Sequence, residues 1–473
     1  MGITAMACNI KKEFASVALG DERRERRLGI LAGQLAASPA SSVSGACGGW
    51  AESMAAYRLV HNPEVTPDKV LAAHRDATLA RAKGSGRLLL VQDTTELDFT
   101  GFKAMGGNGP LSCPERRGFF LHSHLLIAEN GGVALGICGA QSWSRTDEAH
   151  GKRARRKKLP IEEKESMRWM HGYAEACTLA QTFPEQEVIM VADRECDIYE
   201  IYTQAQELLE QKVRRADFII RASSNRALEK GAKLFESVRS APLLGTYEVE
   251  VKHQIQNKKG ADGNRHKTVR QARTALLAVR SARVRLRPPK RPDRKLPVLE
   301  VTAVIAREID PPAGEDPVEW ILLSSLPVED FSAARRLLFD YCQRWLIEEF
   351  HRVLKTGCRV ESLSFSEAAC TQVLIALYMV ISWRILYLRD LSRCYPELPA
   401  SCFFSEMEWR VACIIGRIKR ERAPPLAELV ALIAKMGGYF GRKNDRPPGP
   451  EVIWRGLQKL QCYVEALEAL SAY

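Results

Sequence analysis

The fold is decided by Val188-Ile-Met-Val-Ala-Asp193, an unbroken apolar run that ends in an acid. Earlier in the chain, Arg87-Leu-Leu-Leu-Val-Gln-Asp93 follows the same pattern. Short apolar runs of this kind are typical of buried strands. Open α/β sheets place ligands and catalytic groups beyond the carboxyl ends of their strands. The two runs therefore predict an α/β sheet with Asp93 and Asp193 at functional strand ends.

The elements around these runs extend the same series. Strands are predicted at residues 119–128, 132–138 and 218–221, and helices at residues 165–183 and 197–210. Three strands followed by helix, strand, helix and strand is the order of a ribonuclease-H-like fold. The first seventy residues read as helices, one of them capped by Asp21, and the chain beyond Glu367 has a helical pattern to its end.

A basic region interrupts the α/β series. Residues 252–295 contain fifteen Lys or Arg and two acids, which accounts for the whole net charge of +12. Strands are predicted at 247–252, 275–286 and 298–306, so we interpret the region as a β-rich insertion. Clustered cations favour contact with a phosphate backbone, whereas the plainer interpretation is solvated loops. A second cluster, Lys152–Lys158, is offset by the acids that follow it.

A long helix is predicted from about Asp330 to Lys355. Tyr341, Arg344, Glu348 and Lys355 would share one face of it, because an α-helix turns by 100° per residue. A surface pair of Arg344 with Glu348 explains two of these residues but not the tyrosine. The alternative is a phosphate clamp beside a carboxylate that binds metal.

Strand-terminal acids can also cap helices or form turns, and either aspartate alone would fit that interpretation. Each is followed by further polar residues, in Asp93-Thr-Thr-Glu96 and Asp193-Arg-Glu195. Hard oxygen ligands suit Mg²⁺, with Mn²⁺ as a substitute. With Glu348 as the third ligand, the pattern predicts a two-ion site that acts on phosphate.

Composition narrows the class of protein. A chain of 473 residues predicts two to four domains. The thirteen cysteines contain no CxxC pair, so reduced thiols are expected rather than a zinc site. No signal-like apolar run opens the chain, and the apolar stretch Val373–Trp383 is too short to span a bilayer. We therefore expect a soluble cytoplasmic protein.

The residues quoted above resemble those of the DDE transposases of the IS-four insertion-sequence family. The likeness is carried by Asp93, by Asp193-Arg-Glu195 and by Tyr-x2-Arg-x3-Glu-x6-Lys at residues 341–355. It extends to Ala18–Arg24, Ala56–Arg58, Asn62-Pro63, Arg117-Gly118, His122-Ser123 and Gly437–Phe440. The Lys152–Lys158 cluster and Pro447-Pro448 depart from the family pattern.

The resemblance implies a division of the chain into five segments. Residues 1–70 would bind the transposon end, and residues 71–230 and 319–370 would form a ribonuclease-H-like core. Residues 231–318 would be the β-rich insertion, and residues 371–473 a helical region for dimerisation and DNA contact. A homodimer is expected in the complex with DNA, with neither a membrane nor a nucleotide cofactor.

The resemblance also assigns roles to individual residues. Asp93, Asp193 and Glu348 would be the catalytic metal ligands. The residues that would contact DNA are Tyr341, Arg344, Lys355, Trp320, Arg221, Arg23, Arg24 and Arg27. Trp320 would stack on a flipped base, although a core aromatic residue on a strand fits the sequence equally well.

The implied activity is cut-and-paste transposition of double-stranded DNA. It proceeds by nicking at the transposon end, hairpin formation, hairpin opening and strand transfer into target DNA. One alternative is a ribonuclease-H-like junction resolvase, which the clamp and the N-terminal arginines disfavour. Another is a catalytically silent regulator derived from a transposase and acting through mixed dimers.

Overall fold

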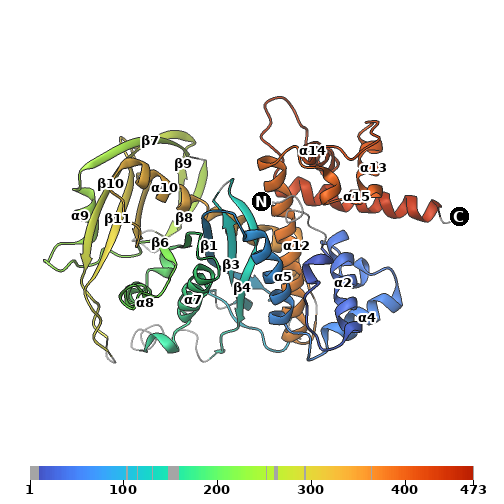
Figure 1. Cartoon of the computed structure of the whole chain (residues 1–473), viewed down its shortest axis with the longest axis horizontal. Helices are drawn as coiled ribbons and strands as arrows, with labels where there is room; N and C mark the ends of the chain where they lie inside the picture. The colour runs from blue at the N-terminus through green and yellow to red at the C-terminus, as the bar shows by residue number, and fades with distance from the viewer. Residues whose placement is uncertain are drawn as a thin grey trace. The chain divides into compact units, whose positions relative to one another are not determined.

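The structure is a computed structural model. It describes residues 10–102, 105–113, 115–129, 131–147, 159–251, 253–259, 265–291, 294–363 and 365–471, without the side chains of 254–259 and 265–269. The chain forms two compact units (Figure 1). The first contains residues up to Arg155, Glu185–Glu187 and Arg344 onward, and the second contains Arg156–Pro184 and Val188–Gln343. The Lys152–Lys158 cluster lies outside the described residues.

The first unit begins with helices, which the sequence predicts for residues 1–70 but not for residues 71–82. They are η1 (Lys12–Phe14), α2 (Glu22–Ala37), α3 (Val43–Ala46), α4 (Trp50–Val60) and α5 (Pro67–Ala82). Asp21 caps α2 as expected, because its carboxylate accepts a hydrogen bond from the backbone of Arg23 at 2.8 Å. Thr66 caps α5, and Pro67 takes the first helical position, where no backbone donor is needed.

The sheet of the first unit contains β1 (Leu88–Asp98), β2 (Gly109–Pro110), β3 (Arg117–Ala128) and β4 (Val133–Trp143). β3 pairs antiparallel with β1, β2 and β4. The prediction that Asp93 ends its strand is wrong. Asp93 lies in the middle of β1 opposite Ser123, because β3 continues the ladder as far as Asp98.

The remaining elements of the first unit are helical. They are α11 (Trp345–Arg352), the π turn η5 (Val353–Gly357), η6 (Val360–Ser362), α12 (Ala368–Cys394), η7 (Ala400–Cys402), α13 (Glu406–Ile415), α14 (Leu426–Met436) and α15 (Pro450–Ser471). Helices α5 and α12 pack against β4 and against each other (Figure 1). Every cysteine within the described ranges is free.

Helix α12 is longer than the apolar run suggested. Of the described part of the chain, it alone has the length and composition to cross a membrane. The prediction that this apolar stretch is too short to span a bilayer was therefore wrong. In the structure, 83% of the most apolar 18-residue stretch of α12 is buried inside the protein, so α12 is the central core helix of the first unit.

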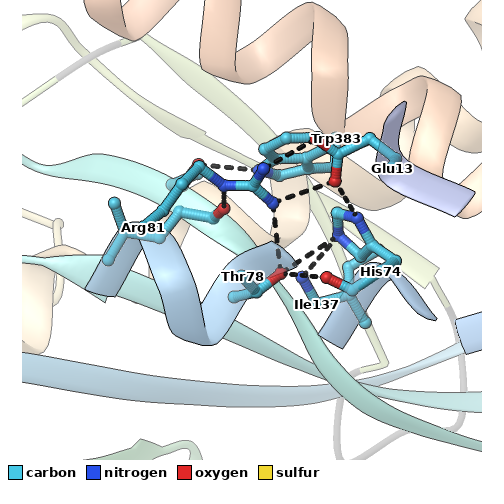
Figure 2. Close-up of polar contacts among 8 residues, drawn as sticks. Glu13, His74, Thr78, Arg81, Ile137 and Trp383 are labelled. Atoms are coloured by element: carbon cyan, nitrogen blue, oxygen red, sulfur yellow. Dashed lines mark hydrogen bonds and ion pairs between the residues drawn. The ribbon is translucent and has the colours of Figure 1, made fainter. Parts of the chain in front are cut away.

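A buried polar cluster joins η1 to α5, β4 and α12 (Figure 2). The Glu13 carboxylate accepts from Arg81 Nη1 at 2.6 Å and from His74 Nδ1 at 2.7 Å. His74 Nε2 accepts from the backbone of Ile137 at 3.0 Å, which fixes the neutral tautomer. The Arg81 guanidinium lies 4.3 Å from the ring centre of Trp383. We call Glu13, His74, Thr78, Arg81 and Trp383 the closed cluster.

Titration in this cluster follows from burial and pairing. Burial alone would raise the pKa of Glu13, but the hydrogen bonds and charges of His74 and Arg81 outweigh it and lower the pKa to about 2. Burial lowers the pKa of His74, and the Glu13 carboxylate opposes that shift only in part. The cluster therefore holds an ionised Glu13, a charged Arg81 and a neutral histidine inside the core.

The second unit contains the rest of the predicted α/β series and the insertion. Its helices are η3 (Ile161–Glu163), α7 (Met167–Thr182), η4 (Arg194–Cys196), α8 (Tyr199–Glu210), α9 (Leu234–Arg239) and α10 (Phe331–Cys342). Its strands are β5 (Val188–Ala192), β6 (Asp217–Arg221), β7 (Leu243–Val251), β8 (Gln254–Lys259), β9 (Arg265–Arg270), β10 (Arg273–Leu286), β11 (Leu299–Glu308) and β12 (Glu319–Ser324).

The sheet of the second unit follows the order β5-β6-β12-β11-β10-β7. β5 and β6 are parallel, and each later pair is antiparallel. β8 and β9 form a separate hairpin that the sequence did not predict. The insertion is therefore β-rich, and its strands continue the sheet that begins with β5.

The prediction of a single helix from Asp330 to Lys355 is wrong. The helical segment is interrupted between α10 and α11. There the Gln343 amide donates to the carbonyl oxygens of Phe339 and Asp340, and the Ile347 amide donates to that of Arg344, three residues back. Hydrogen bonds over three residues tighten the turn and change the rotation of the following helix. The predicted face is therefore divided along the chain among α10, the interruption, α11 and η5, which carry Tyr341, Arg344, Glu348 and Lys355 in turn.

Candidate active site

Two of the three predicted acids lie beside one arginine in the first unit. Arg344 Nη1 lies 3.4 Å from Asp93 Oδ2, and Nη2 of the same guanidinium donates to Glu348 Oε1. The side chains are partly exposed, at 18% for Asp93, 17% for Arg344 and 33% for Glu348. We call these three residues the open cluster. The predicted pair of Arg344 with Glu348 is present, but it does not explain why Arg344 also reaches Asp93.

Apolar packing places α11 against the strand that carries Asp93. Ile347 and Phe350 are fully buried, and α11 contacts β1. His351 Nε2 lies 3.2 Å from the hydroxyl of Ser123, the residue paired with Asp93 on β3. Burial, aided by the charge of Lys355, lowers the pKa of His351 to about 3, so the imidazole is neutral.

Lys355 lies on the π turn η5, next to the same strand. Its ammonium donates to the carbonyl oxygen of Glu96 at 2.8 Å and lies 3.2 Å from Glu361 Oε1. Glu361 in turn accepts from the backbone of Asp98 at 2.9 Å. Lys355 is thus fixed over β1, near Asp93 along the chain, with 31% of its side chain exposed.

The sequence interpretation did not include Glu96 as an ion-pair partner. Its carboxylate accepts from the Ser112 backbone at 2.9 Å and from Arg116 at 2.7 Å. Burial raises its pKa, but the Ser112 hydrogen bond and the charges of Arg116 and Arg145 prevail and lower it. Glu96 follows Asp93 by an odd number of residues, so the two side chains point to opposite faces of β1.

Asp193 belongs to the second unit, where it ends β5 as predicted. Its carboxylate also caps η4, since it accepts from the Glu195 backbone at 2.8 Å. The cap interpretation is therefore correct for Asp193, and it leaves the second carboxylate oxygen for other contacts. Glu195 pairs with the largely buried Arg168 at 2.6 Å.

The loop after Asp193 is held by a second residue that the sequence interpretation missed. Asp197 is buried and accepts from Arg226, from the Tyr202 hydroxyl at 2.8 Å and from the Ser223 backbone at 2.8 Å. The signal was present in the sequence as an acid shortly after Asp193. Its partner lies beyond β6, so only the fold could reveal the pair.

Three predicted DNA contacts gather around β12 in the second unit. The ring centres of Trp320 and Tyr341 lie 6.4 Å apart. Arg221 is paired with Leu322 on β12, and its Nη2 donates to the Glu319 carbonyl at 3.2 Å. Trp320 is half-buried, which fits neither a fully buried core aromatic nor a freely exposed one.

The three N-terminal arginines have different surroundings. Arg23 is exposed, while Arg24 donates to the Leu19 carbonyl at 2.8 Å. Arg27 pairs with the Glu52 carboxylate at 2.5 Å and also donates to its carbonyl oxygen, which ties α2 to α4. Arg23 is the best presented of the three for a phosphate, and Arg27 has a structural partner.

The fold also neutralises part of the basic insertion. Arg273 pairs with Glu308 at 2.7 Å and with Glu315 at 2.6 Å. Further pairs join Arg283 to Glu300, Arg285 to Glu229, Arg291 to Glu200 and Arg294 to Glu162. All of these acids lie outside residues 252–295, so the sequence count overstated the free positive charge.

The residues of the open cluster suit a divalent cation. Their carboxylate oxygens are hard ligands, and the cation that lies between them here is the Arg344 guanidinium. Within the described ranges, no group of three His, Cys, Asp or Glu side chains is already arranged as a metal site. The two carboxylates of the first unit supply at most part of such a site.

Comparison with known families gives three matches along the chain. Residues 7–65 match the family described as transposase DNA-binding, residues 171–383 match the transposase DDE domain, and residues 380–473 match the transposase Tn5 dimerisation domain. The chain is therefore a DNA transposase of the DDE class, with a ribonuclease-H-like core. It belongs to the Tn5-like DDE transposases, which confirms the resemblance inferred from the sequence.

The matches also assign coarse roles to the segments. DNA binding falls to the N-terminal helices and dimer formation to the C-terminal helices. DDE domains act with divalent metal ions, and the DDE match contains Asp193 and Glu348. Asp93 precedes the matched range, so its assignment depends on its position beside Arg344 and Glu348.

Proposed function

We propose that this enzyme performs cut-and-paste transposition with Asp93, Asp193 and Glu348 as its catalytic carboxylates. The observation that carries the proposal is the open cluster, in which Arg344 spans Asp93 and Glu348. An arginine that joins two partly exposed carboxylates marks a place where positive charge is required. The DDE match supports Asp193 as the third carboxylate.

Two Mg²⁺ ions, with Mn²⁺ as a substitute, would supply Lewis-acid activation of the attacking oxygen and stabilisation of the leaving oxygen. The chain's own residues then orient the DNA strand. Arg344 offers a planar fork of donors that suits a phosphate, and Lys355, which is fixed over the protein strand β1, offers a point charge. Tyr341 would contact the phosphate near the cleavage point.

The proposed sequence begins with hydrolytic nicking at the transposon end. The freed 3′-hydroxyl attacks the opposite strand to form a hairpin, which is reopened before the end is joined to target DNA. Hairpin formation requires an unstacked base, and the half-buried Trp320 ring beside Tyr341 is suited to stack on it. Arg221 would contact DNA near this ring, and Arg23, Arg24 and Arg27 would contact the transposon end.

We place this activity in the bacterial cytoplasm, on DNA, with a homodimer formed in the complex. The five segments inferred from the sequence remain our proposed domain boundaries. The second unit does not separate the insertion from β5 and β6, so we treat residues 231–318 as an extension of the core sheet.

The proposal is tested with full-length protein, Mg²⁺ and double-stranded DNA that carries the inverted repeats flanking its gene. Excision with hairpin ends is the expected result. Cleavage of four-way junctions without end cleavage would favour a junction resolvase. End binding without cleavage would favour a catalytically silent regulator.

A further inference from the structure

The residue next to the proposed ligand Glu348 points into a second charged network. Glu349 lies one position along α11, about 100° around the helix axis. Its carboxylate contacts the Arg389 guanidinium on α12 and lies 4.0 Å from Arg352. Helix α11 therefore presents one carboxylate to the open cluster and the next one to the core helix.

Arg389 connects this helix to the sheet. Its side chain is only 3% exposed, and its Nε and Nη2 lie 2.7 and 2.6 Å from Asp390 Oδ1. Asp390 Oδ2 accepts from the backbone of Ala134, on β4, at 3.3 Å. Since β4 pairs with β3 and β3 pairs with β1, the chain of contacts ends on the sheet that carries Asp93.

Helix α11 needs such an anchor because its own backbone fixes it poorly. It has eight residues, follows the interrupted turn at Gln343-Arg344 and runs into the π turn η5. A short helix with irregular ends gains little rigidity from its own hydrogen bonds. Two polar contacts hold it to the core, His351 with Ser123 and Glu349 with Arg389.

We propose that Arg389 is a positioning residue that sets the rotation of α11 and so directs the Glu348 carboxylate toward Asp93. This inference rests on the proposed catalytic role of Glu348. The planar fork of Arg389 holds Glu349 and Asp390 at fixed angles, which a lysine cannot reproduce. A small rotation of α11 would move Glu348 relative to Asp93, and the contact of Glu349 with Arg389 adds a polar constraint on that rotation to the apolar packing of Ile347 and Phe350.

A stabilising role alone does not account for the choice of residues. Replacing a buried ion pair by apolar side chains is often neutral or stabilising, so burial of three charges is a poor route to stability. Their value lies in a single permitted geometry. The closed cluster offers a matched comparison, because Arg81 is also a buried arginine that contacts α12 and pairs with a carboxylate, and its hydrogen bonds go to η1, α5 and the sheet at Leu135.

The test compares the full-length variants R389M, R389K, E349Q and R81K with the parent protein. The measurements are single-turnover nicking at a terminal inverted repeat, affinity for that DNA, and melting temperature. For R389M we expect nicking to slow by about 10- to 100-fold, the loss typical when a residue that orients a ligand is removed, with DNA affinity unchanged within about twofold.

The conservative variants keep the test decisive if R389M fails to fold. R389K should restore only part of the nicking rate. E349Q, which still offers an acceptor to Arg389, should lose less than R389M. R81K should lower the melting temperature without slowing nicking of the folded protein. Parental nicking rates in folded R389M or in R389K would overturn the proposal.

A second readout does not depend on cleavage. Mn²⁺ binding to the protein without DNA, followed by electron paramagnetic resonance, should weaken in R389M and R389K but not in R81K. If the parent protein fails to nick its DNA, the proposed function falls, and the Mn²⁺ titration still decides the role of Arg389. Equal Mn²⁺ affinity in the parent protein and R389K would exclude a positioning role.

Discussion

The closed and open clusters of the first unit use the same chemistry for different ends. Each joins an arginine to a carboxylate that lies far from it in the sequence, Glu13 in the closed cluster and Asp93 in the open cluster. In the closed cluster, Glu13 and Arg81 are 3% and 4% exposed, and their polar atoms contact neighbours within the core. In the open cluster, Asp93 and Glu348 remain partly exposed around Arg344.

The difference shows where charge stabilises and where it is kept available. A buried arginine with all its partners fixed cannot exchange them without a large loss of stability. A partly exposed arginine such as Arg344 can leave its carboxylates when a cation or a phosphate offers a better partner. Variants of the closed cluster should therefore change stability, and variants of the open cluster should change catalysis.

The largest effect is expected for Glu348→Gln. The substitution removes one carboxylate charge from the open cluster but keeps the shape of the side chain. Nicking should fall by more than about a thousandfold, equivalent to about 4 kcal/mol of activation free energy, while end binding and melting temperature stay close to those of the parent. Near-normal nicking in a gel assay would remove Glu348 from the site.

Arg81→Met should show the opposite pattern. It leaves the Glu13 carboxylate buried without its cation, so the free energy of unfolding should fall by about 3–5 kcal/mol. Nicking by the fraction that remains folded should be unchanged. Denaturant unfolding checks the first statement and a single-turnover assay the second. If the fully folded variant nicked DNA more slowly than the parent, the closed cluster would also affect catalysis, and the contrast between the two clusters would be wrong.

Arg344→Ala should separate two steps of the reaction. The first nick needs the carboxylates, whereas hairpin formation also needs the strand to be held in line. Hairpin formation should slow by about a hundredfold, as when one preorganised donor is lost, and the first nick by clearly less. If a single-turnover time course showed equal slowing of the first nick and of hairpin formation, Arg344 would act only by holding Asp93 and Glu348.

The pH dependence of stability should come from buried neutral histidines. The pKa of His74 is lowered from 6.5 by burial, so the unfolded chain binds its proton first as the pH falls. Stability is therefore lost below about pH 6.5, at up to about 1.4 kcal/mol per pH unit for each such group. His74→Gln should flatten the slope between pH 7 and 5. If the slope of stability against pH persisted in this variant, His351, with a pKa of about 3, would be the source of the pH dependence.

The smallest effect concerns the basic insertion. Arg287, Lys290 and Lys295 are exposed, whereas Arg283 and Arg285 pair with Glu300 and Glu229. Replacing the first three residues by alanine should reduce the slope of log affinity against log salt by about 2 to 3. The double variant of Arg283 and Arg285 is the control and should change it less. An unchanged slope in both would make this region a solvated surface.

Local patterns in the sequence predicted most of the fold. Apolar runs such as Val188–Ala192 and the cap at Asp21 depend on neighbouring residues, and both are present as expected. The continuation of β1 past Asp93 was not predicted, because it depends on pairing with the distant strand β3. The interruption after Cys342 was not predicted either, because hydrogen bonds over three residues replace the helical ones there without a change in residue pattern. A β3 ladder and a tight turn leave no periodic signal in the sequence.

The residues of the candidate site also fall into those that the sequence could identify and those that only the fold could identify. Asp93, Arg344 and Glu348 could be named from the sequence because residue type and spacing are local properties. Arg389 and Asp197 could not be named, since each acts through a contact made by the fold. The pairing of insertion arginines with distant acids was missed for the same reason.

The most direct test of the account is to locate Mn²⁺ by anomalous diffraction in crystals of the full-length protein bound to its terminal-repeat DNA. The account predicts manganese within about 2.5 Å of carboxylate oxygens of Asp93, Asp193 and Glu348, with Arg344 turned from the carboxylates to a phosphate. Manganese bound elsewhere, or Arg344 still joining Asp93 to Glu348 in a complex that cleaves DNA, would contradict it.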